Sequence, residues 1–286
     1  MQIGKEIKII RELLGYSQED LAKKLNTTFE VINRWENDKV IPEGKNIEKV
    51  YEFAFKNKIF LNKIYEQMYK DVYQTNNTVV LFHGSKRGIE GPLSFAFSKD
   101  ANDFGKGFYL GETFEQAATY IAYSNSKKVY AFTLDKKNLN IIQLNVDEEW
   151  MYAIAYYRGW IEEFKEHKKI KDIIEKIEKA DVVIAPIADN KMFDLIGEYV
   201  DGILTDQQCI NALSCTNLGY QYVAKTQKGL DGLQEIREMY LCDKEKQECI
   251  EKRLEYNKIG LDKVKIARIE YKNKGKYIKE VLRWRN

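Results

Sequence analysis

The sequence is short of proline, histidine and long apolar runs, and each shortage excludes a class of protein. Three prolines among 286 residues, with 31% charged and 44% apolar residues, exclude a collagen-like or disordered chain and allow a buried core. No apolar run approaches the roughly 18 residues that a membrane-spanning helix needs. Lys5, Glu6 and Lys8 interrupt the start, where a signal peptide needs an apolar stretch. We therefore expect a cytoplasmic protein without a membrane partner.

Metal and disulfide chemistry have few residues to draw on. The four cysteines show no C-x-x-C spacing, and the two histidines are His83 and His167. A structural zinc site takes four clustered ligands, so we expect no metal, and thiols that stay reduced and pack as small hydrophobic groups. His167 belongs to a stretch with the composition of a charged, solvated helix, and we assign it no function.

Charge and residue pattern divide the chain into three expected domains. Residues 1–75 carry 13 basic and 12 acidic side chains and have the pattern of short helices, whereas residues 76–242 mix short β runs with helices. Residues 243–286 are predicted as a mostly helical extension, and the last thirty residues of the chain hold ten basic and three acidic side chains. This basic extension packs on the middle domain, binds the backbone of a nucleic acid, or contacts a partner protein.

The first domain has the pattern of helices joined by tight turns. Apolar residues recur at helical spacing from Ile3 to Leu14, and Gly15 ends that helix. Ser17 begins SQEDLAKKL, and the acidic Asp20 three residues later makes a pattern close to a capping box. A second short helix follows through FEVINRWEN. Two short helices joined by a tight turn inside a helical bundle are the plan of a helix-turn-helix.

Residues 11–42, RELLGYSQEDLAKKLNTTFEVINRWENDKVIP, resemble the XRE-type, phage-repressor-like helix-turn-helix. The resemblance implies a helix from residue 28 to 37 in the major groove of DNA, and a homodimer on a two-fold site. It makes six residues available to DNA: Gln18, Thr28, Phe29, Glu30, Asn33 and Arg34. The second helix carries Glu30 and Glu36 against Arg34, and DNA binding normally needs a basic surface. A docking or dimerisation module without DNA binding is the alternative.

After residue 77 the pattern changes to short β runs, predicted at 78–82, 128–134, 139–144, 181–186 and 220–225. Helical stretches lie between them without strict βαβ alternation, which favours an α+β fold over a doubly wound sheet. Two motifs stand out: LFHGS at 81–85, and DFGKGFYLGETFEQAATY at 103–120. The Gly84 backbone can pair with a flat amide, and Tyr109 and Tyr120 can sandwich an aromatic ring. With His83 they predict a nicotinamide pocket.

The two motifs resemble the catalytic domain of ADP-ribosyltransferases of the diphtheria-toxin and poly(ADP-ribose) polymerase branch. LFHGS resembles that branch's H-G-[ST] motif, and FGKGFYLGETFEQAATY its F-G-x-G-[IV]-Y-F motif with a second tyrosine at the same spacing. The resemblance extends over residues 78–240 and is closest to short bacterial domains found in toxin–antitoxin and phage-defence loci. It implies a split-sheet fold that binds NAD+ as a substrate in a cleft, and an antitoxin as a further partner.

The resemblance also implies roles for individual residues. His83 bonds the adenosine ribose 2′-hydroxyl, the Gly84 backbone binds the nicotinamide carboxamide, and Ser85 sits beside the ribose. Tyr109 and Tyr120 stack on the nicotinamide ring. With Gln221, His83 and Tyr109 make up the implied catalytic set.

Two positions depart from the family's pattern. The family's catalytic glutamate corresponds to Gln221, in GYQYVAKT, and a serine that faces the carboxamide corresponds to Ala117. Cleavage of the glycosidic bond of NAD+ develops positive charge on the ribose, which a carboxylate stabilises and an amide does not. A glutamine still holds a hydroxyl group but cannot act as a base.

The expected activity is therefore mono-ADP-ribosyl transfer to a protein or nucleic-acid target. The alternatives are a transcription regulator whose inactive transferase domain senses NAD+, and an NAD+ glycohydrolase. Three further polar residues rank lower. Gln208 faces the cleft as the reserve for Gln221, Asp189 closes the site or, more in keeping with its position, caps a helix, and Glu112 begins a solvent-exposed helical turn.

Overall fold

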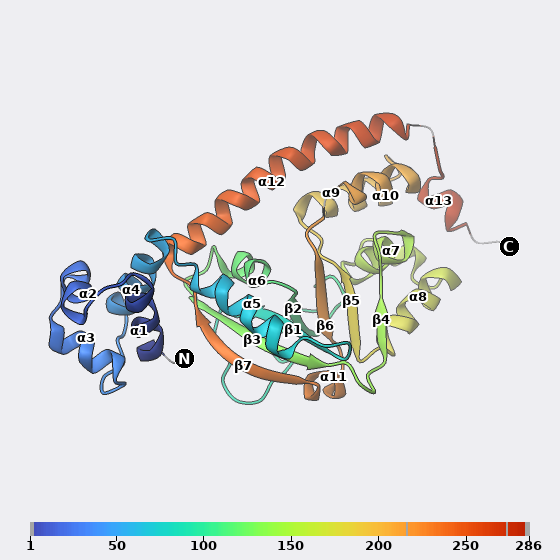
Figure 1. Ribbon diagram of the computed structural model, residues 1–286. Helices are drawn as coiled ribbons and strands as arrows, with labels where there is room; N and C mark the ends of the chain where they lie inside the picture. The colour runs from blue at the N-terminus through green and yellow to red at the C-terminus, as the bar shows by residue number, and fades with distance from the viewer. Residues whose placement is uncertain (1–2, 216, 273, 284–286) are drawn as a thin grey trace.

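The computed structural model describes residues 3–215, 217–272 and 274–283 and joins a helical N-terminal region to a mixed β-sheet (Figure 1). The three C-terminal residues of the basic extension lie outside this range. In chain order the elements are α1 (Ile3–Leu13), α2 (Gln18–Leu25), α3 (Phe29–Glu36), α4 (Lys45–Lys56), α5 (Leu61–Tyr73), β1 (Thr78–Gly84), β2 (Phe108–Gly111), α6 (Phe114–Ile121), β3 (Lys128–Asp135), β4 (Ile141–Gln143), α7 (Glu148–Tyr157), η1 (Glu162–Phe164), α8 (Lys168–Glu178), β5 (Val182–Pro186), α9 (Asn190–Val200), α10 (Asp206–Ser214), β6 (Tyr220–Ala224), α11 (Gln227–Asp231), β7 (Leu233–Tyr240), α12 (Asp243–Glu270) and α13 (Ile278–Val281).

The N-terminal helices form where their end signals predict them. Ser17 and Asp20 make a reciprocal capping box at the start of α2, and Gly15 takes a left-handed φ of 66° just after α1. Asn26 ends α2 in the left-handed conformation, φ 54°, which asparagine tolerates better than most residues. The tight turn between α2 and α3 follows directly, so the predicted helix-turn-helix geometry is confirmed.

Within the described chain the sheet has seven strands in the order β4-β5-β6-β2-β1-β3-β7. Strands β4 and β5 run parallel, and the other neighbouring pairs run antiparallel. The sheet is therefore mixed, and together with the helices it confirms the expected α+β class. No helix in the described ranges is both long enough and apolar enough to cross a bilayer.

The two faces of the sheet are covered differently. On one face, α5 and α6 contact β1, and α7, α9 and α10 enclose a core that includes Val183 and Val223. On the other face, Leu81, Phe108 and Phe132 join a core that is covered partly by the loop after β1 and by α11. Because strand side chains alternate, each residue of the central strands is committed to one of these two cores.

The sequence pattern misses two strands. At β2 it predicts only a glycine-rich turn that delivers Tyr109, and at β7 it predicts no strand. In β7 the register jumps at Ile236, because Glu235 lies opposite Phe132 and Arg237 lies opposite Ala131. This bulge inserts one extra residue into β7. The apolar residues Leu233, Ile236 and Met239 are therefore spaced three apart, and the two-residue alternation that is typical of a strand is absent from the sequence.

A buried ion pair joins the helix-turn-helix region to the edge of the sheet. Glu6 of α1 is 3% exposed and pairs with Arg237 of β7, and the Tyr51 hydroxyl of α4 donates to the same carboxylate. The Arg237 guanidinium also lies over the Tyr65 ring, 4.5 Å from its centroid. Burial raises the pKa of Glu6 despite the opposing charge of Arg237, so the pair depends on both partners staying in place.

A second contact lies three residues further on, at the C-terminal end of β7. Glu48 of α4 pairs with Lys127, and it accepts hydrogen bonds from the Tyr240 hydroxyl at 2.6 Å and the Asp243 backbone N–H at 2.6 Å. Asp243 is the first residue of α12, which runs from α4 past α6 to α10 (Figure 1). The C-terminal extension therefore packs along the molecule, as the first of its three predicted roles requires.

Helix α5 does not belong to the helix-turn-helix bundle in its packing. It contacts β1 and α6, and Asn62 at its start donates to Tyr240 O at 2.9 Å and to Glu245 at 2.7 Å. One continuous core holds both N-terminal residues such as Ile7 and sheet residues such as Phe82. The division expected after residue 75 is therefore not a break in packing.

Replacing Arg237 by Ala should lower the free energy of unfolding by about 3–5 kcal/mol, because it leaves the Glu6 carboxylate buried without its cation. The folded pKa of Glu6 is already raised and rises further in this variant. A raised carboxyl pKa means that stability falls as the pH climbs through it, so the loss should be larger near pH ~8 than near pH ~5. Urea unfolding at both pH values measures this.

The matched control replaces both partners, Glu6→Gln with Arg237→Met. It removes both charges, so most of the stability should return. An equal loss in the single and double variants would contradict the assignment.

Candidate functional site

Three neighbouring strands bring the two sequence motifs together with Gln221. Gly111 of β2 lies opposite Phe82 of β1 on one side and opposite Gln221 of β6 on the other. This register brings together residues from positions 82, 111 and 221 of the chain. His83 is one residue from Phe82, and Tyr109 is two residues from Gly111 and lies opposite Val223. The three candidate residues therefore lie within two residues of the aligned positions on neighbouring strands.

The ladder between β1 and β2 ends at this level. The pairing stops at Phe82 and Gly111, and the next ladder bond would run from the Gly84 N–H to the Tyr109 carbonyl. That carbonyl instead lies 2.7 Å from Nδ1 of His83. The His83 ring also stacks on Phe108, with 4.3 Å between ring centroids. The imidazole thus takes up the Tyr109 carbonyl at the point where the two strands stop pairing.

The contact with Tyr109 fixes the proton on His83. A carbonyl oxygen can only accept, so Nδ1 carries the hydrogen and donates it, and Nε2 of the neutral ring is an acceptor. Burial lowers the pKa of His83 from its ordinary value, although the bond to Tyr109 opposes this. The ring therefore presents a neutral acceptor nitrogen, which suits a hydroxyl group as its donor.

Gly84 serves two purposes at the end of β1. A Cβ here would lie 2.2 Å from the Ala117 carbonyl of α6, so glycine is required because the helix backbone covers this face. The close contact that excludes a side chain at position 84 is therefore made by α6. The Ser85 N–H donates to Lys128 O, its direct opposite on β3. By alternation, the N–H and C=O of Gly84 point toward β2, where the ladder has ended.

Tyr109 is anchored through its hydroxyl group to the glycine-rich turn. The hydroxyl donates to Gly105 O at 2.7 Å and accepts from the Phe104 N–H at 3.1 Å. Burial raises the pKa of this phenol far above its ordinary value, so it stays protonated. Gly107 is required next to it, because a Cβ there would lie 2.5 Å from Val223. The tyrosine therefore holds a fixed ring at the start of β2.

Gln221 shares the face of Tyr109 but not that of His83. Tyr109 lies opposite Val223, and Gly111 opposite Gln221, so Tyr109 and Gln221 point to the same side. Phe82 shares that side because it pairs with Gly111, and His83, the next residue, points to the other. The resemblance groups Gln221 with His83 and Tyr109 in one catalytic set, but strand alternation puts the His83 side chain on the opposite face of the sheet.

The amide of Gln221 is bound by two acceptors. Its Nε2 donates to Oδ2 of Asp103 at 3.1 Å and to the Pro186 carbonyl at 3.2 Å, and the residue is 8% exposed. Oδ1 of Asp103 pairs in turn with Arg158 at 2.8 Å. Lys225 donates to the Phe104 carbonyl at 2.6 Å. The turn that anchors Tyr109 is therefore tied to Gln221 as well.

Sequence reasoning did not find Asp103 or Arg158. Asp103 directly precedes the FGKG motif, and that position was the only signal available for it. Arg158 follows the aromatic helix α7, and nothing in its local sequence distinguishes it. Its guanidinium lies 3.4 Å from the centroid of the Phe193 ring, which holds it beside Asp103.

The remaining motif residues are placed as follows. Tyr120 of α6 is 63% exposed, with Lys86 Nζ 4.7 Å from its ring centroid. Ala117 is buried and faces Gly84 through its carbonyl. The Ser85 hydroxyl donates to Gly88 O at 2.8 Å, so it closes a turn, and its expected place beside the ribose stays a prediction.

Four lower-ranked residues have structural partners. Asp189 caps α9 through the Met192 N–H, as its position predicts, and His167 caps α8 and is not inside a helix. Glu112 accepts from the Tyr220 N–H at 3.1 Å and thus ties β2 to β6, in place of the exposed turn that was expected. Gln208 accepts from Thr205 and donates to Arg268 O of α12 at 3.1 Å, so it does not face Gln221.

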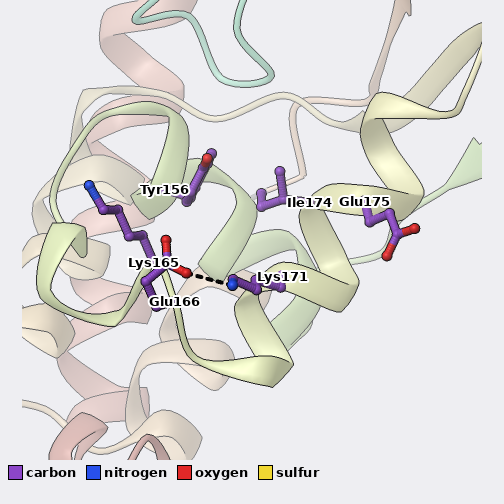
Figure 2. A pocket seen from close by; sticks show the side chains of 6 residues that line it. All are labelled: Tyr156, Lys165, Glu166, Lys171, Ile174 and Glu175. Carbon is purple, nitrogen blue, oxygen red and sulfur yellow. Dashed lines mark ion pairs between the residues drawn. The ribbon is translucent and has the colours of Figure 1, made fainter.

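Two open surface pockets lie away from this junction of strands. One is a hollow between α7 and α8, lined by Tyr156, Lys165, Glu166, Lys171, Ile174 and Glu175 (Figure 2). An ion pair of 2.5 Å joins Lys171 and Glu166 across it. The other follows β3 and α11. Neither is lined by a candidate site residue among those that the structure describes, so the candidate site rests on strand register and hydrogen bonds.

The six expected DNA contacts fall into two groups. Gln18 and Asn33 are bonded to each other at 3.2 Å, and Gln18 donates to Glu36 at 2.8 Å, while Arg11 pairs with Glu36 at 2.7 Å. This network fixes α2 against α3. The other four residues are exposed on or just before α3: Thr28, Phe29, Glu30 and Arg34.

Comparison with known proteins finds one family model for each of the two regions. A helix-turn-helix family model matches residues 7–53, and this similarity supports DNA binding by the N-terminal region. A second model, described as a protein of unknown function (DUF3990), matches residues 79–234. That match covers more than half of the chain, and the chain therefore belongs to the DUF3990 family. No curated protein and no solved structure matches it.

We predict that His83 is protonated on Nδ1 and titrates at a lower pH than the ordinary histidine pKa of about 6.5. A folded pKa below the unfolded value means that the native state loses stability as the pH falls below the unfolded pKa. Long-range ¹H–¹⁵N spectra in a His167→Asn variant, which keeps a cap for α8, observe His83 alone. An Nε2-protonated ring, or titration at the ordinary value, would overturn the assignment.

Arg34→Ala should weaken binding to duplex DNA and lower the slope of log affinity against log salt by about 0.9, the release expected for one phosphate contact. Fluorescence anisotropy on a duplex selected from a random library, over a series of salt concentrations, measures both quantities. The control is Lys176→Ala, which removes an exposed cation of α8 far along the chain. Equal effects of the two substitutions would contradict the prediction that α3 contacts the DNA.

Proposed function

We propose that the chain is an NAD+-dependent mono-ADP-ribosyltransferase that carries its own DNA-binding region. The observation that carries the proposal is the register at Gly111, which brings His83, Tyr109 and Gln221 within two residues of the aligned positions on adjacent strands. These are the residues that the resemblance to ADP-ribosyltransferases selects, and each comes from a different part of the chain.

In this proposal the nicotinamide half of NAD+ lies where the ladder between β1 and β2 ends. The Gly84 N–H and C=O point toward β2 and match the acceptor and donor of a carboxamide. The fixed ring of Tyr109 offers one stacking surface, and Tyr120 offers a second, exposed one. The acceptor nitrogen of His83 suits a ribose 2′-hydroxyl at the adenosine end. These groups bind and orient the substrate without a metal.

The reaction breaks the bond between C1′ of the ribose and N1 of nicotinamide, and the bonding electrons leave with the nicotinamide nitrogen. A nucleophile on the acceptor forms the new bond to C1′, and its proton passes to the solvent or to a base of the acceptor. Because Gln221 cannot take that proton, the acceptor must be a good nucleophile without help. This chemistry favours a single transfer over polymer synthesis.

The helix-turn-helix gives the proposed enzyme a location. Its contacts to the sheet through Glu6 and Glu48 hold the proposed site at a fixed distance from bound DNA. DNA binding then regulates the chain's own gene or brings the site to a nucleic-acid acceptor. A toxin–antitoxin or phage-defence setting stays a prediction of the resemblance.

One observation favours a second candidate, a transcription regulator that senses NAD+ without turning it over. The residue in the glutamate position is uncharged, and the buried Glu6–Arg237 pair joins that sheet to the DNA-binding helices. NAD+ binding without nicotinamide release, together with a change in DNA affinity, would select this candidate over the transferase.

Incubating the full chain with NAD+ should release nicotinamide and add ADP-ribose to an acceptor. Chromatography follows the nicotinamide, and mass spectrometry examines the chain itself, added protein, RNA and DNA. His83→Ala should weaken apparent NAD+ binding by about 2- to 12-fold, the range for one lost hydrogen bond. An increase in KM that is larger than the change in kcat would indicate that His83 acts in binding.

The matched control is His167→Asn, which changes the other histidine and keeps a capping side chain on α8. It should behave as the wild type. Release of nicotinamide without modification of any acceptor would indicate a glycohydrolase. If the wild-type chain forms neither product, the enzymatic proposal is overturned.

A further inference from the structure

We infer that Asp103 is a positioning residue that turns the amide of Gln221 so that its carbonyl oxygen, not its nitrogen, faces the substrate. The identity of that substrate, a ribose hydroxyl of NAD+, rests on the proposed function. The orientation itself rests on hydrogen bonds within the chain.

The two ends of the Gln221 amide differ in what they can bond. An amide nitrogen has two hydrogens to donate, and its oxygen accepts. Both hydrogens of Nε2 are used by groups that only accept, Oδ2 of Asp103 at 3.1 Å and the Pro186 carbonyl at 3.2 Å. Turning the amide over would put its oxygen against these two oxygens. The amide therefore has one favourable orientation, with Oε1 as the end left to meet a donor.

Asp103 is itself held so that it cannot turn away. Its other oxygen pairs with Arg158 at 2.8 Å, and the Asp103 side chain is 13% exposed. The Arg158 guanidinium lies against the Phe193 ring, 3.4 Å from the centroid. The ion pair with Arg158 therefore holds the Asp103 carboxylate in place, and the carboxylate in turn holds the Gln221 amide.

This arrangement explains how glutamine serves at a position where the related enzymes use glutamate. A ribose hydroxyl needs an acceptor oxygen, and the positioned Oε1 supplies one. The negative charge that Gln221 lacks lies on Asp103, on the far side of the amide, where it polarises the amide toward its oxygen. Gln221 thus supplies the oxygen that bonds the substrate, and Asp103 supplies the negative charge.

The same geometry makes Gln221→Glu unfavourable. A carboxylate at position 221 would face the Asp103 carboxylate and the Pro186 carbonyl, with no hydrogen to give to either. Restoring the glutamate of the related enzymes should therefore impair the chain unless Asp103 also changes. Asp103→Asn supplies an N–H₂ that donates to an oxygen of the carboxylate introduced at position 221, so the double variant exchanges donor and acceptor.

The test compares the wild type, Q221E, D103N and the double variant D103N/Q221E. Q221E should lower the melting temperature, more strongly at alkaline than at acidic pH, because protonation relieves the repulsion between the two carboxylates. The double variant should recover most of that loss. The coupling between the two positions is obtained from the four melting temperatures, and it needs no enzymatic activity.

Turnover and NAD+ binding give the second readout. Q221E should lower kcat by about tenfold or more, as expected for loss of one hydrogen bond to a charged group, and the double variant should regain turnover above Q221E. Asp100→Asn is the matched control, because Asp100 precedes Asp103 in the same loop but is exposed and pairs with Lys106. It should change neither quantity.

The outcomes separate this inference from the proposed function. Coupled melting temperatures without any NAD+ turnover would keep the orientation and overturn the transferase. Normal turnover together with an unchanged melting temperature in Q221E, or no recovery in the double variant, would overturn the role of Asp103 and leave the transferase standing.

Discussion

The hydrogen bond from the His83 imidazole to the Tyr109 carbonyl replaces the ladder bond that would otherwise join β1 to β2, and the candidate site depends on this replacement. Because the ladder ends there, the backbone of Gly84 is directed at a place where a ligand can pair with it. The same bond fixes the histidine tautomer. If β1 and β2 paired for one more step, the Gly84 backbone would bond to Tyr109. The Gly84 backbone would then not be free for a ligand, and His83 would lose the bond that fixes its tautomer.

The second constraint is the connection between the DNA-binding helices and the sheet. Glu6 and Glu48 reach from the helical region to the C-terminal half of β7, and α12 continues from there past α6 to α10. The buried Glu6–Arg237 pair is sensitive to the loss of either partner. A change in the position of β7 would therefore be felt directly by α1 and α4 of the helix-turn-helix region.

Local signals in the sequence predicted much of this structure, and long-range geometry set the rest. The capping box at Ser17 and the cap of α9 at Asp189 are readable from the sequence because they depend on neighbouring residues. The face on which His83 lies depends on strand register, which no local pattern contains. The bulge at Ile236 hid a strand for the same reason. Asp103 acquires its role only when β6 brings Gln221 beside it.

The central claim is that NAD+ binds where β1 and β2 stop pairing, and a crystal structure of the chain soaked with NAD+ tests it most directly. The account predicts the nicotinamide carboxamide on the backbone of Gly84, its ring against Tyr109, and a ribose hydroxyl within hydrogen-bond distance of Gln221 Oε1. NAD+ bound at another place, or a carboxamide away from Gly84, would contradict it.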